Sequence, residues 1–222
     1  MGLSISKSSR RKPKSAPTTR LLLVRHAEVE KNYHKIFGGR IDMNLSPRGR
    51  AQARMLAKYL RAKAPDAIYA SPMKRVQQTL APFLKPGARA QTILPELREI
   101  DFGDWTGLNW EAVCRKFNLR THEWLDHIER GVAPNGESGP QFRARVEPCL
   151  KKIIRRNRGK TVAIFCHGGV VRMILSILLE LPLPKTNSFE VEYASLTQVA
   201  LHPRLVEIEL LNFTPWRDWY EK

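Results

Sequence analysis

The chain has 222 residues, a formal net charge of +17 and 42% hydrophobic residues, which suits one α/β domain with a sizeable core. The three cysteines, at positions 114, 149 and 166, lack CxxC or zinc-ligand spacing, so neither a disulfide framework nor a structural zinc site is expected. No apolar stretch reaches the roughly 18 residues of a membrane span, and no apolar signal segment follows the basic start. We therefore expect a soluble, cytoplasmic protein.

The N-terminus is strongly basic. Its first 20 residues hold six Lys or Arg and no acid, in a stretch rich in Ser, Thr and Pro that cannot build a core. We expect residues 1–19 to be a disordered tail and residues 20–222 to form one catalytic domain. The start MGLSIS matches the myristoylation pattern at Gly2, so the tail is either a weak anchor to an anionic membrane or a solvated arm.

The first half of the body alternates between strands and helices. Residues 20–25 are almost continuously apolar, which predicts a strand buried on both faces. Ser46-Pro47 predicts a helix to about residue 64, with Ser as N-cap and Pro at the first helical position. Residues 67–70 are predicted as a strand, and Ser71-Pro72 repeats the helix signal up to about residue 84.

The second half continues this alternation around an insertion. Residues 93–94 are predicted as part of a strand, and residues 105–154 as an irregular helical cap, interrupted at residues 134–136. Residues 161–166 form the clearest strand, followed by a helix from about residue 170, and residues 195–201 and 205–213 alternate as strands do. The predicted fold is a three-layer α/β/α sandwich with a mostly parallel central sheet and a helical cap insertion.

Three groups of phosphate-seeking residues fall at predicted strand ends. They are Arg25-His26, the segment 71–75 that ends in Arg75, and His167-Gly168-Gly169. Ligands of open α/β sheets bind beyond the carboxyl ends of the strands, so the three groups indicate one site. Phosphoryl transfer needs a nucleophile, cations around the phosphate and an acid for the leaving oxygen. A neutral imidazole is a competent nucleophile, and neighbouring guanidinium groups disfavour its protonated form.

Six motifs occur in order: LVRHAEVEKN, GRIDMNLSPRGRAQA, YASPMKRVQQT, LREIDFGDWTG, PNGES and FCHGGVVR. Together they resemble the histidine phosphatase superfamily in its phosphoglycerate-mutase-like branch, over residues 20–213. The LREIDFGDWTG segment is also similar to alpha-ribazole phosphatases and related small phosphatases. The resemblance implies phosphomonoester hydrolysis through a phosphohistidine, on a small phosphorylated metabolite and without a metal or other cofactor.

The resemblance also implies roles for single residues. His26 would accept the phosphoryl group, Glu99 would be the proton donor, and His167 would be a catalytic residue that helps to bind the phosphate. A carboxyl group that donates must keep its proton, so Glu99 should be partly buried. The implied phosphate ligands and substrate contacts are Arg25, Arg75, Asn32 and Gly168, with Arg40 as either a substrate contact or a solvated loop arginine. One position departs from the family pattern, because Ala27 stands where Gly is usual, which would strain a backbone with positive φ.

Other interpretations stay open. Cys166 to Arg172 spells C-x5-R, the spacing of cysteine-dependent phosphatases, although that loop would leave the Arg25-His26 pair unexplained. The histidines at positions 34, 122, 127 and 202 have no ligand-like spacing. Glu137 and Ser138 are predicted to begin a helix rather than to contact substrate.

Three functions compete at this stage. The short segment 105–136 favours a phosphatase over a phosphoglycerate mutase, since mutases of the family carry a longer insertion there. A non-catalytic polyanion-binding module is the third hypothesis, in view of the positive charge. A small phosphorylated substrate is the expected partner, no specific nucleic acid is expected, and the sequence does not indicate an oligomeric state.

Overall fold

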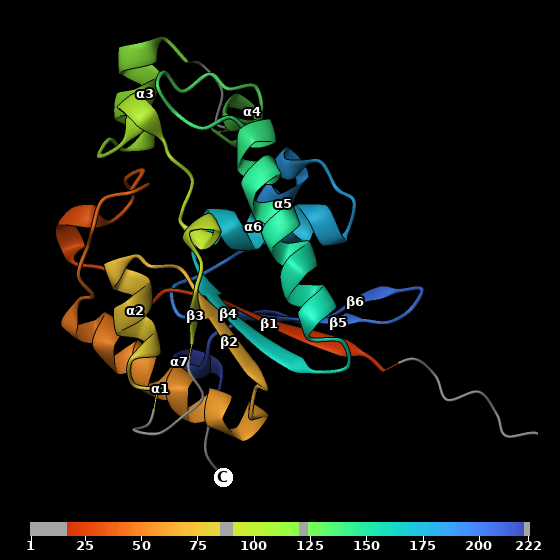
Figure 1. Ribbon diagram of the computed structural model, residues 1–222. Coiled ribbons are helices and arrows are strands. Elements are labelled where there is room, and N and C mark those ends of the chain that lie inside the picture. The colour runs from red at the N-terminus through yellow and green to blue at the C-terminus, as the bar shows by residue number, and fades with distance from the viewer. Residues whose placement is uncertain (1–16, 85–90, 120–123, 220–222) are drawn as a thin grey trace, which may run out of the picture.

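A computed structural model describes residues 17–84, 91–119 and 124–219 of the chain. Its centre is a six-stranded sheet of order β3-β2-β4-β1-β5-β6 with helices on both faces (Figure 1). The four parallel strands are β1 (Thr19–Arg25), β2 (Ala67–Ala70), β3 (Thr92–Ile93) and β4 (Thr161–Cys166). Strand β5 (Leu196–Leu201) pairs antiparallel with β1, and β6 (Val206–Phe213) pairs antiparallel with β5. The predicted three-layer sandwich is confirmed.

Alternate side chains of β1 enter two separate cores. Leu21 and Leu23 belong to the core beneath α5 (Gly139–Arg156) and α6 (Gly168–Leu178). Leu22 and Val24 belong to the core on the other face, beneath α1 (Pro47–Lys63) and α2 (Lys74–Leu80). All four side chains are at most 1% exposed. Because both faces of the strand are covered, the sequence is apolar at consecutive positions rather than at alternate ones.

Helix α1 begins as the sequence predicts. The Ser46 hydroxyl accepts a hydrogen bond of 2.8 Å from the backbone N–H of Gly49, and Pro47 occupies the first helical position. A Cβ atom on Gly49 would lie 2.0 Å from the carbonyl oxygen of Glu28. Only glycine allows this approach, which packs α1 directly against the segment that follows β1.

Helix α2 begins later than predicted. It starts at Lys74 with Met73 as a cap that offers no side-chain hydrogen bond, and it ends at Leu80. The Ser71 hydroxyl, predicted as the cap, accepts from the Met73 N–H at 3.4 Å and lies 2.8 Å from Nε2 of His167. It therefore combines a long local bond with a shorter polar contact across the sheet edge.

The helical insertion is smaller than predicted. Helices α3 (Trp110–Phe117) and α4 (Trp124–Glu129) stand at the top of Figure 1, away from the sheet. Helix α5, which the predicted cap 105–154 included, belongs instead to the helical layer, because Phe142 and Val146 are buried in the core shared with α6. The insertion among the described residues is therefore α3, α4 and their connections.

The last described residues dock on the body through two tryptophans. The indole N–H of Trp216, in α7 (Pro215–Asp218), donates to the carbonyl oxygen of Tyr193 at 3.1 Å. The ring of Trp219 meets that of Tyr59 edge-on, with 5.5 Å between centroids.

Two sequence predictions concern residues that the structure does not describe. Most of the predicted tail, with Gly2, and also His122 lie outside the described residues, and β1 begins at Thr19. None of the described helices combines the length and apolar character that crossing a membrane requires.

Candidate active site

The predicted residue groups meet at the carboxyl ends of three neighbouring strands. Arg25 ends β1 beside Cys166 of β4, and His26 and His167 are the next residues of the two strands. The ring centroids of the two histidines lie 5.3 Å apart, and both side chains are almost fully buried. Ser71 follows β2 at the same edge of the sheet. The convergence predicted from sequence is therefore present in the structure, although the chemical roles stay predictions.

Arg75 lies between the two imidazole rings. Its Nε–H points to Nε2 of His26 at 3.3 Å and to Nδ1 of His167 at 3.2 Å. Its two Nη groups donate to the carbonyl oxygens of Gly39 and Ile41, both at 2.8 Å. The side chain is 2% exposed, so a fixed positive charge stands beside both rings.

Hydrogen bonds define which nitrogen of each ring carries the proton. Nδ1 of His26 lies 2.9 Å from the carbonyl oxygen of Ala27, which can only accept, so the proton is on Nδ1 and the lone pair on Nε2. Nδ1 of His167 accepts from Arg75, so its Nε2–H donates to the Ser71 hydroxyl. Nε2 of His26 is therefore unprotonated, and its lone pair shares the Nε–H of Arg75 with Nδ1 of His167 at the wall of the site.

Both histidines are held in the neutral form. Burial lowers the pKa of His26 well below its ordinary value of 6.5, and the charges of Arg75 and Arg25 lower it further. Burial and Arg75 lower the pKa of His167 in the same way. An uncharged imidazole among fixed cations is the state that a nucleophile toward phosphorus requires.

Ala27 fits its position without strain. Its backbone has no positive φ, its side chain is buried in the core beneath α1, and its N–H donates to the Thr79 hydroxyl at 2.9 Å. Thr79 in turn donates to the carbonyl oxygen of Arg75. The alanine that departs from the family pattern is therefore accommodated, and Thr79 joins the turn after β1 to the helix that carries Arg75.

The Glu99 side chain lies beside the N-terminus of α6. It is half-buried, as predicted. Its carboxylate accepts hydrogen bonds from the N–H groups of Gly169 at 3.2 Å and of Ile100 at 3.1 Å. A Cβ atom on Gly169 would lie 2.4 Å from this carboxylate, so a larger residue here would displace the Glu99 side chain. Gly168, the first residue of α6, lies with Glu99 along the wall of the site.

Arg25 has one buried N–H group to which no described residue offers an acceptor. Its Nη1 donates to the carbonyl oxygen of Val191, and its guanidinium lies 4.2 Å from the centre of the Tyr193 ring. Its Nε is buried and finds no hydrogen-bond partner among the described residues. A buried N–H without a partner is costly, and here it lies beside Gly168 at the start of α6, where a helix N-terminus favours an anion.

A cavity of about 240 Å³ opens beside these groups. Three polar side chains in its wall are not predicted as site residues from the sequence: Tyr33, Arg172 and Tyr193, whose ring lies 5.6 Å from that of His26. The sequence marks Arg172 only as the end of the C-x5-R spacing, and Tyr193 has no neighbouring motif. The apolar part of the wall includes Val29, Ile36, Phe37, Met43, Phe102 and Trp124.

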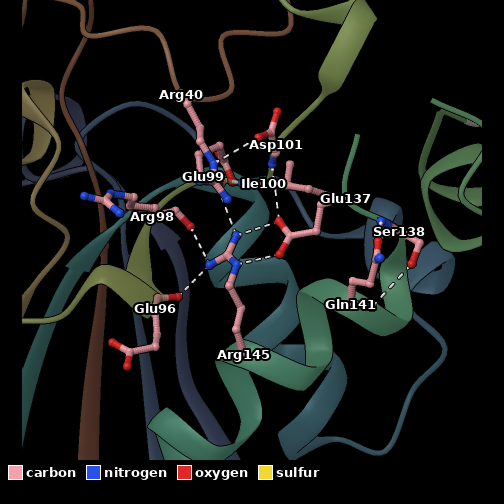
Figure 2. Close-up of polar contacts among 10 residues, drawn as sticks. All are labelled: Arg40, Glu96, Arg98, Glu99, Ile100, Asp101, Glu137, Ser138, Gln141 and Arg145. Carbon is pink, nitrogen blue, oxygen red and sulfur yellow. Dashed lines mark hydrogen bonds and ion pairs between the residues drawn. The ribbon is translucent and has the colours of Figure 1, made fainter. Parts of the chain in front are cut away.

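Two predicted contacts are not brought to the cavity. Asn32, on the short 3-10 helix η1 (Lys31–Tyr33), is exposed, and its neighbour Tyr33 lines the cavity in its place. Arg40 is exposed and pairs with Asp101 at 3.3 Å (Figure 2). The structure therefore brings neither side chain to the cavity, and for Arg40 it agrees with the alternative of a solvated loop arginine. A motif gives a residue's place in the chain but not the direction of its side chain.

His34 and His202 make local contacts. Nε2 of His34 lies 2.8 Å from the carbonyl oxygen of Val29, and Nε2 of His202 pairs with Glu207. Within residues 17–84, 91–119 and 124–219, no three His, Cys, Asp or Glu side chains gather in a way that could hold a metal ion.

Stability should depend on pH through the two buried histidines. The folded chain keeps them neutral, whereas unfolded histidines take up protons as pH falls through 6.5, so the unfolded chain binds more protons in acid. The free energy of unfolding should fall between about pH 7 and pH 5, by up to about 1.4 kcal/mol per histidine and pH unit. Thermal unfolding in phosphate-free buffers tests this, and His167→Gln should give a shallower dependence. Equal slopes for the two proteins would contradict it.

Cys166 is unsuited to act as a nucleophile. It is 0% exposed, and burial raises the pKa of its thiol far above the usual range, so the reactive thiolate is not formed. Cys166→Ala should therefore keep turnover of an aryl phosphate within about twofold, with a modest loss of stability from the small cavity. Loss of turnover in a folded Cys166→Ala protein would restore the cysteine mechanism.

A comparison with known proteins decides the family. The model of the histidine phosphatase superfamily (branch 1) matches residues 21–214. The chain belongs to the histidine phosphatase superfamily. Phosphoserine phosphatase 1 of Hydrogenobacter thermophilus is 33% identical over 197 residues, which cover 88% of this chain and 92% of that protein.

Two further matches place the chain within the superfamily. A 2,3-bisphosphoglycerate-dependent phosphoglycerate mutase of Methylobacterium radiotolerans is 36% identical over 169 residues, covering 71% of this chain and 78% of that protein. The solved structure of the alpha-ribazole phosphatase from Shigella flexneri superposes with a TM-score of 0.77 at 24% identity, covering 88% and 96% of the two chains. The structural match confirms the phosphoglycerate-mutase-like fold, and the sequence matches include both phosphatases and mutases.

Proposed function

We propose that this member of the histidine phosphatase superfamily is a metal-independent phosphatase that hydrolyses small phosphomonoesters through a phosphohistidine at His26. The observation that carries the proposal is the neutral, buried imidazole of His26, whose Nε2 lone pair lies between the site and the guanidinium of Arg75. Binding a phosphate requires cations but no nucleophile. The combination therefore favours catalysis over passive binding of an anion.

The first step transfers the phosphoryl group to the enzyme. Nε2 of His26 attacks phosphorus while the bond from phosphorus to the leaving oxygen breaks, which forms an N–P bond. Arg25, Arg75 and the N-terminus of α6 stabilise the charge on the equatorial oxygens. Glu99 gives its proton to the leaving oxygen, so the product departs as a neutral alcohol.

The second step releases phosphate. The Glu99 carboxylate accepts a proton from water while the water oxygen attacks phosphorus. The N–P bond breaks, phosphate leaves, and the neutral His26 and protonated Glu99 are restored. No metal ion or redox cofactor takes part in either step.

Water is the proposed acceptor of the phosphoryl group. Two observations support hydrolysis: the short insertion of α3 and α4, and a phosphatase among the relatives that matches 92% of its own length. The match to a phosphoglycerate mutase is the specific observation that favours transfer to a second hydroxyl instead.

The cavity favours a leaving group with apolar surface. Phe37, Phe102 and Trp124 form an aromatic wall, with ring centroids 4.8 to 6.0 Å apart. Arg172 donates to the carbonyl oxygens of Thr186 and Phe189, so part of its donor capacity is already used. Burying apolar surface of the substrate against this wall would contribute roughly 25 cal/mol per Å².

A panel of phosphorylated metabolites tests the proposal. It should contain phosphoserine, mono- and bisphosphoglycerates, alkyl phosphates and aryl phosphates. We expect release of inorganic phosphate in an amount equal to the alcohol formed, with the highest kcat/KM for an apolar or aromatic leaving group. Alcohol or isomerised phosphoglycerate without matching phosphate would show a mutase, and absence of turnover across the panel would refute the phosphatase.

A further inference from the structure

Arg145 of helix α5 uses every N–H group of its guanidinium to bind Glu137 and the segment that carries Glu99 (Figure 2). Nε and Nη2 donate to the two carboxylate oxygens of Glu137, at 2.6 and 2.8 Å. The remaining N–H groups donate to the carbonyl oxygens of Glu96, Arg98 and Glu99, at 2.6, 2.9 and 3.1 Å. Two of the five donors of this side chain therefore hold Glu137, and the other three connect α5 to the backbone of residues 96–99.

The pair is sheltered from solvent. The side chains of Arg145 and Glu137 are 19% and 10% exposed. A bidentate contact in such a place is stronger and more directional than a surface ion pair. Glu137 directly precedes Ser138, whose hydroxyl and Gln141 form a capping box at the start of α5. The Arg145–Glu137 pair thus joins α5 to the residue that precedes its capped N-terminus.

Glu99 itself lies in a stretch without regular secondary structure. Residues 98–102, between the 3-10 helices η2 (Pro95–Leu97) and η3 (Gly103–Trp105), have neither helical nor sheet structure. Glu137 also bonds to Asp101 from two sides, since its N–H donates to the Asp101 carbonyl at 2.8 Å and its carboxylate accepts from the Asp101 N–H at 3.3 Å. The Arg145–Glu137 pair therefore anchors the chain on both sides of Glu99.

We propose that Arg145, paired with Glu137, is a positioning residue that places the Glu99 carboxyl group at the leaving oxygen of the substrate. The proposal rests on the proposed function, in which Glu99 is the proton donor. Arg145 touches neither substrate nor the phosphoryl group. It acts through the three carbonyl groups that it holds.

A comparison of two aryl phosphates measures this role. Phenyl phosphate needs protonation of its leaving oxygen, whereas 2,4-dinitrophenyl phosphate expels a stable anion and needs little. In Arg145→Met, kcat/KM should fall roughly 10- to 100-fold for phenyl phosphate, and no more than a few-fold for the dinitrophenyl ester. Glu99→Gln should show the same pattern with a larger ratio. A side chain that merely supports the fold would lower both rates by the same factor.

Arg143→Met is the matched control. Arg143 lies on the same helix, pairs with Glu147 at 3.4 Å in a more exposed place, and donates to the Ser176 hydroxyl at 2.8 Å. Its removal also costs an ion pair and a hydrogen bond, but it does not touch residues 96–101. We expect equal, small changes for the two substrates.

Folding and the proposed function are checked separately. Thermal unfolding shows whether Arg145→Met is folded; if it is not, Arg145→Lys decides, because lysine keeps a positive charge beside Glu137 but cannot reach three carbonyl groups. An equal loss on both substrates in the folded variant would overturn the positioning role. If the wild-type chain does not hydrolyse these esters, or His26→Ala still does, it is the proposed function that fails.

Discussion

Turnover should disappear when His26 is replaced by alanine. The proposed mechanism has no second nucleophile, because His26 lines the cavity with an unprotonated Nε2, whereas the Nε2–H of His167 is directed to Ser71 and His167 is not among the lining residues. Removing a nucleophile that forms a covalent intermediate costs on the order of 10⁴-fold or more in kcat. The phosphate ligands stay in place, so binding of inorganic phosphate should persist.

Three measurements on His26→Ala complete the test. Steady-state release of phosphate from an aryl phosphate gives the loss of rate, and rapid quenching into alkali shows whether the acid-labile phosphohistidine forms in the wild type and not in the variant. The rise in melting temperature with inorganic phosphate shows that the site is still assembled. His202→Ala, which alters a histidine paired with Glu207 on the surface, serves as control. Turnover that survives in His26→Ala would exclude the nucleophile.

The sequence predicts the sheet and the position of the site well, because both depend on strong local signals. The doubly buried strands β1 and β4 have continuous apolar runs, and their neighbourhood in a parallel sheet follows from the α/β alternation. Once the strands are placed, His26 and His167 must lie at the same edge. The site could therefore be located without coordinates.

What the sequence predicts poorly is the direction of individual side chains. Ser71 followed by Pro72 has the pattern of a helix cap, but the helix begins at Lys74, and the hydroxyl makes its shorter contact with His167 rather than with the local Met73 N–H. Asn32 lies in the expected segment and faces solvent. The hydrogen bonds from Arg145 to the carbonyl groups of residues 96–99 span 46 to 49 residues of sequence, and no local pattern indicates a partner at such a distance.

The extent of the insertion could not be predicted for a related reason. Helix α5 has an apolar stripe, as any helix of a layered fold has, and the turn at residues 134–136 gave no indication of which side of it belongs to the sheet. Packing decides this, since Phe142 and Val146 enter the core beneath α6. The consequence for function is direct, because α5 carries Arg145 and thereby reaches the active site from the helical layer.

Replacing Glu99 with glutamine should separate the two chemical steps. The amide keeps the size of the side chain and one of the two oxygens, which accept separately from the N–H groups of Gly169 and Ile100, but it has no acidic proton to give. For phenyl phosphate, kcat/KM should fall by roughly 10² to 10⁴, the usual contribution of a general acid. For 2,4-dinitrophenyl phosphate the first step should remain fast, because its leaving group needs no proton.

The second step gives the Glu99→Gln prediction a signature of its own. Water attacks the phosphohistidine only if a base takes its proton, and an amide is a much weaker base than a carboxylate. With the dinitrophenyl ester, the variant should therefore release a rapid burst of dinitrophenolate equal to the enzyme concentration, followed by slow turnover while phosphoenzyme accumulates. Stopped-flow absorbance and alkaline quenching measure the two quantities. A variant that loses both substrates equally and shows no burst would place the proton donor elsewhere, since the acid and the base of this mechanism are the same carboxyl group.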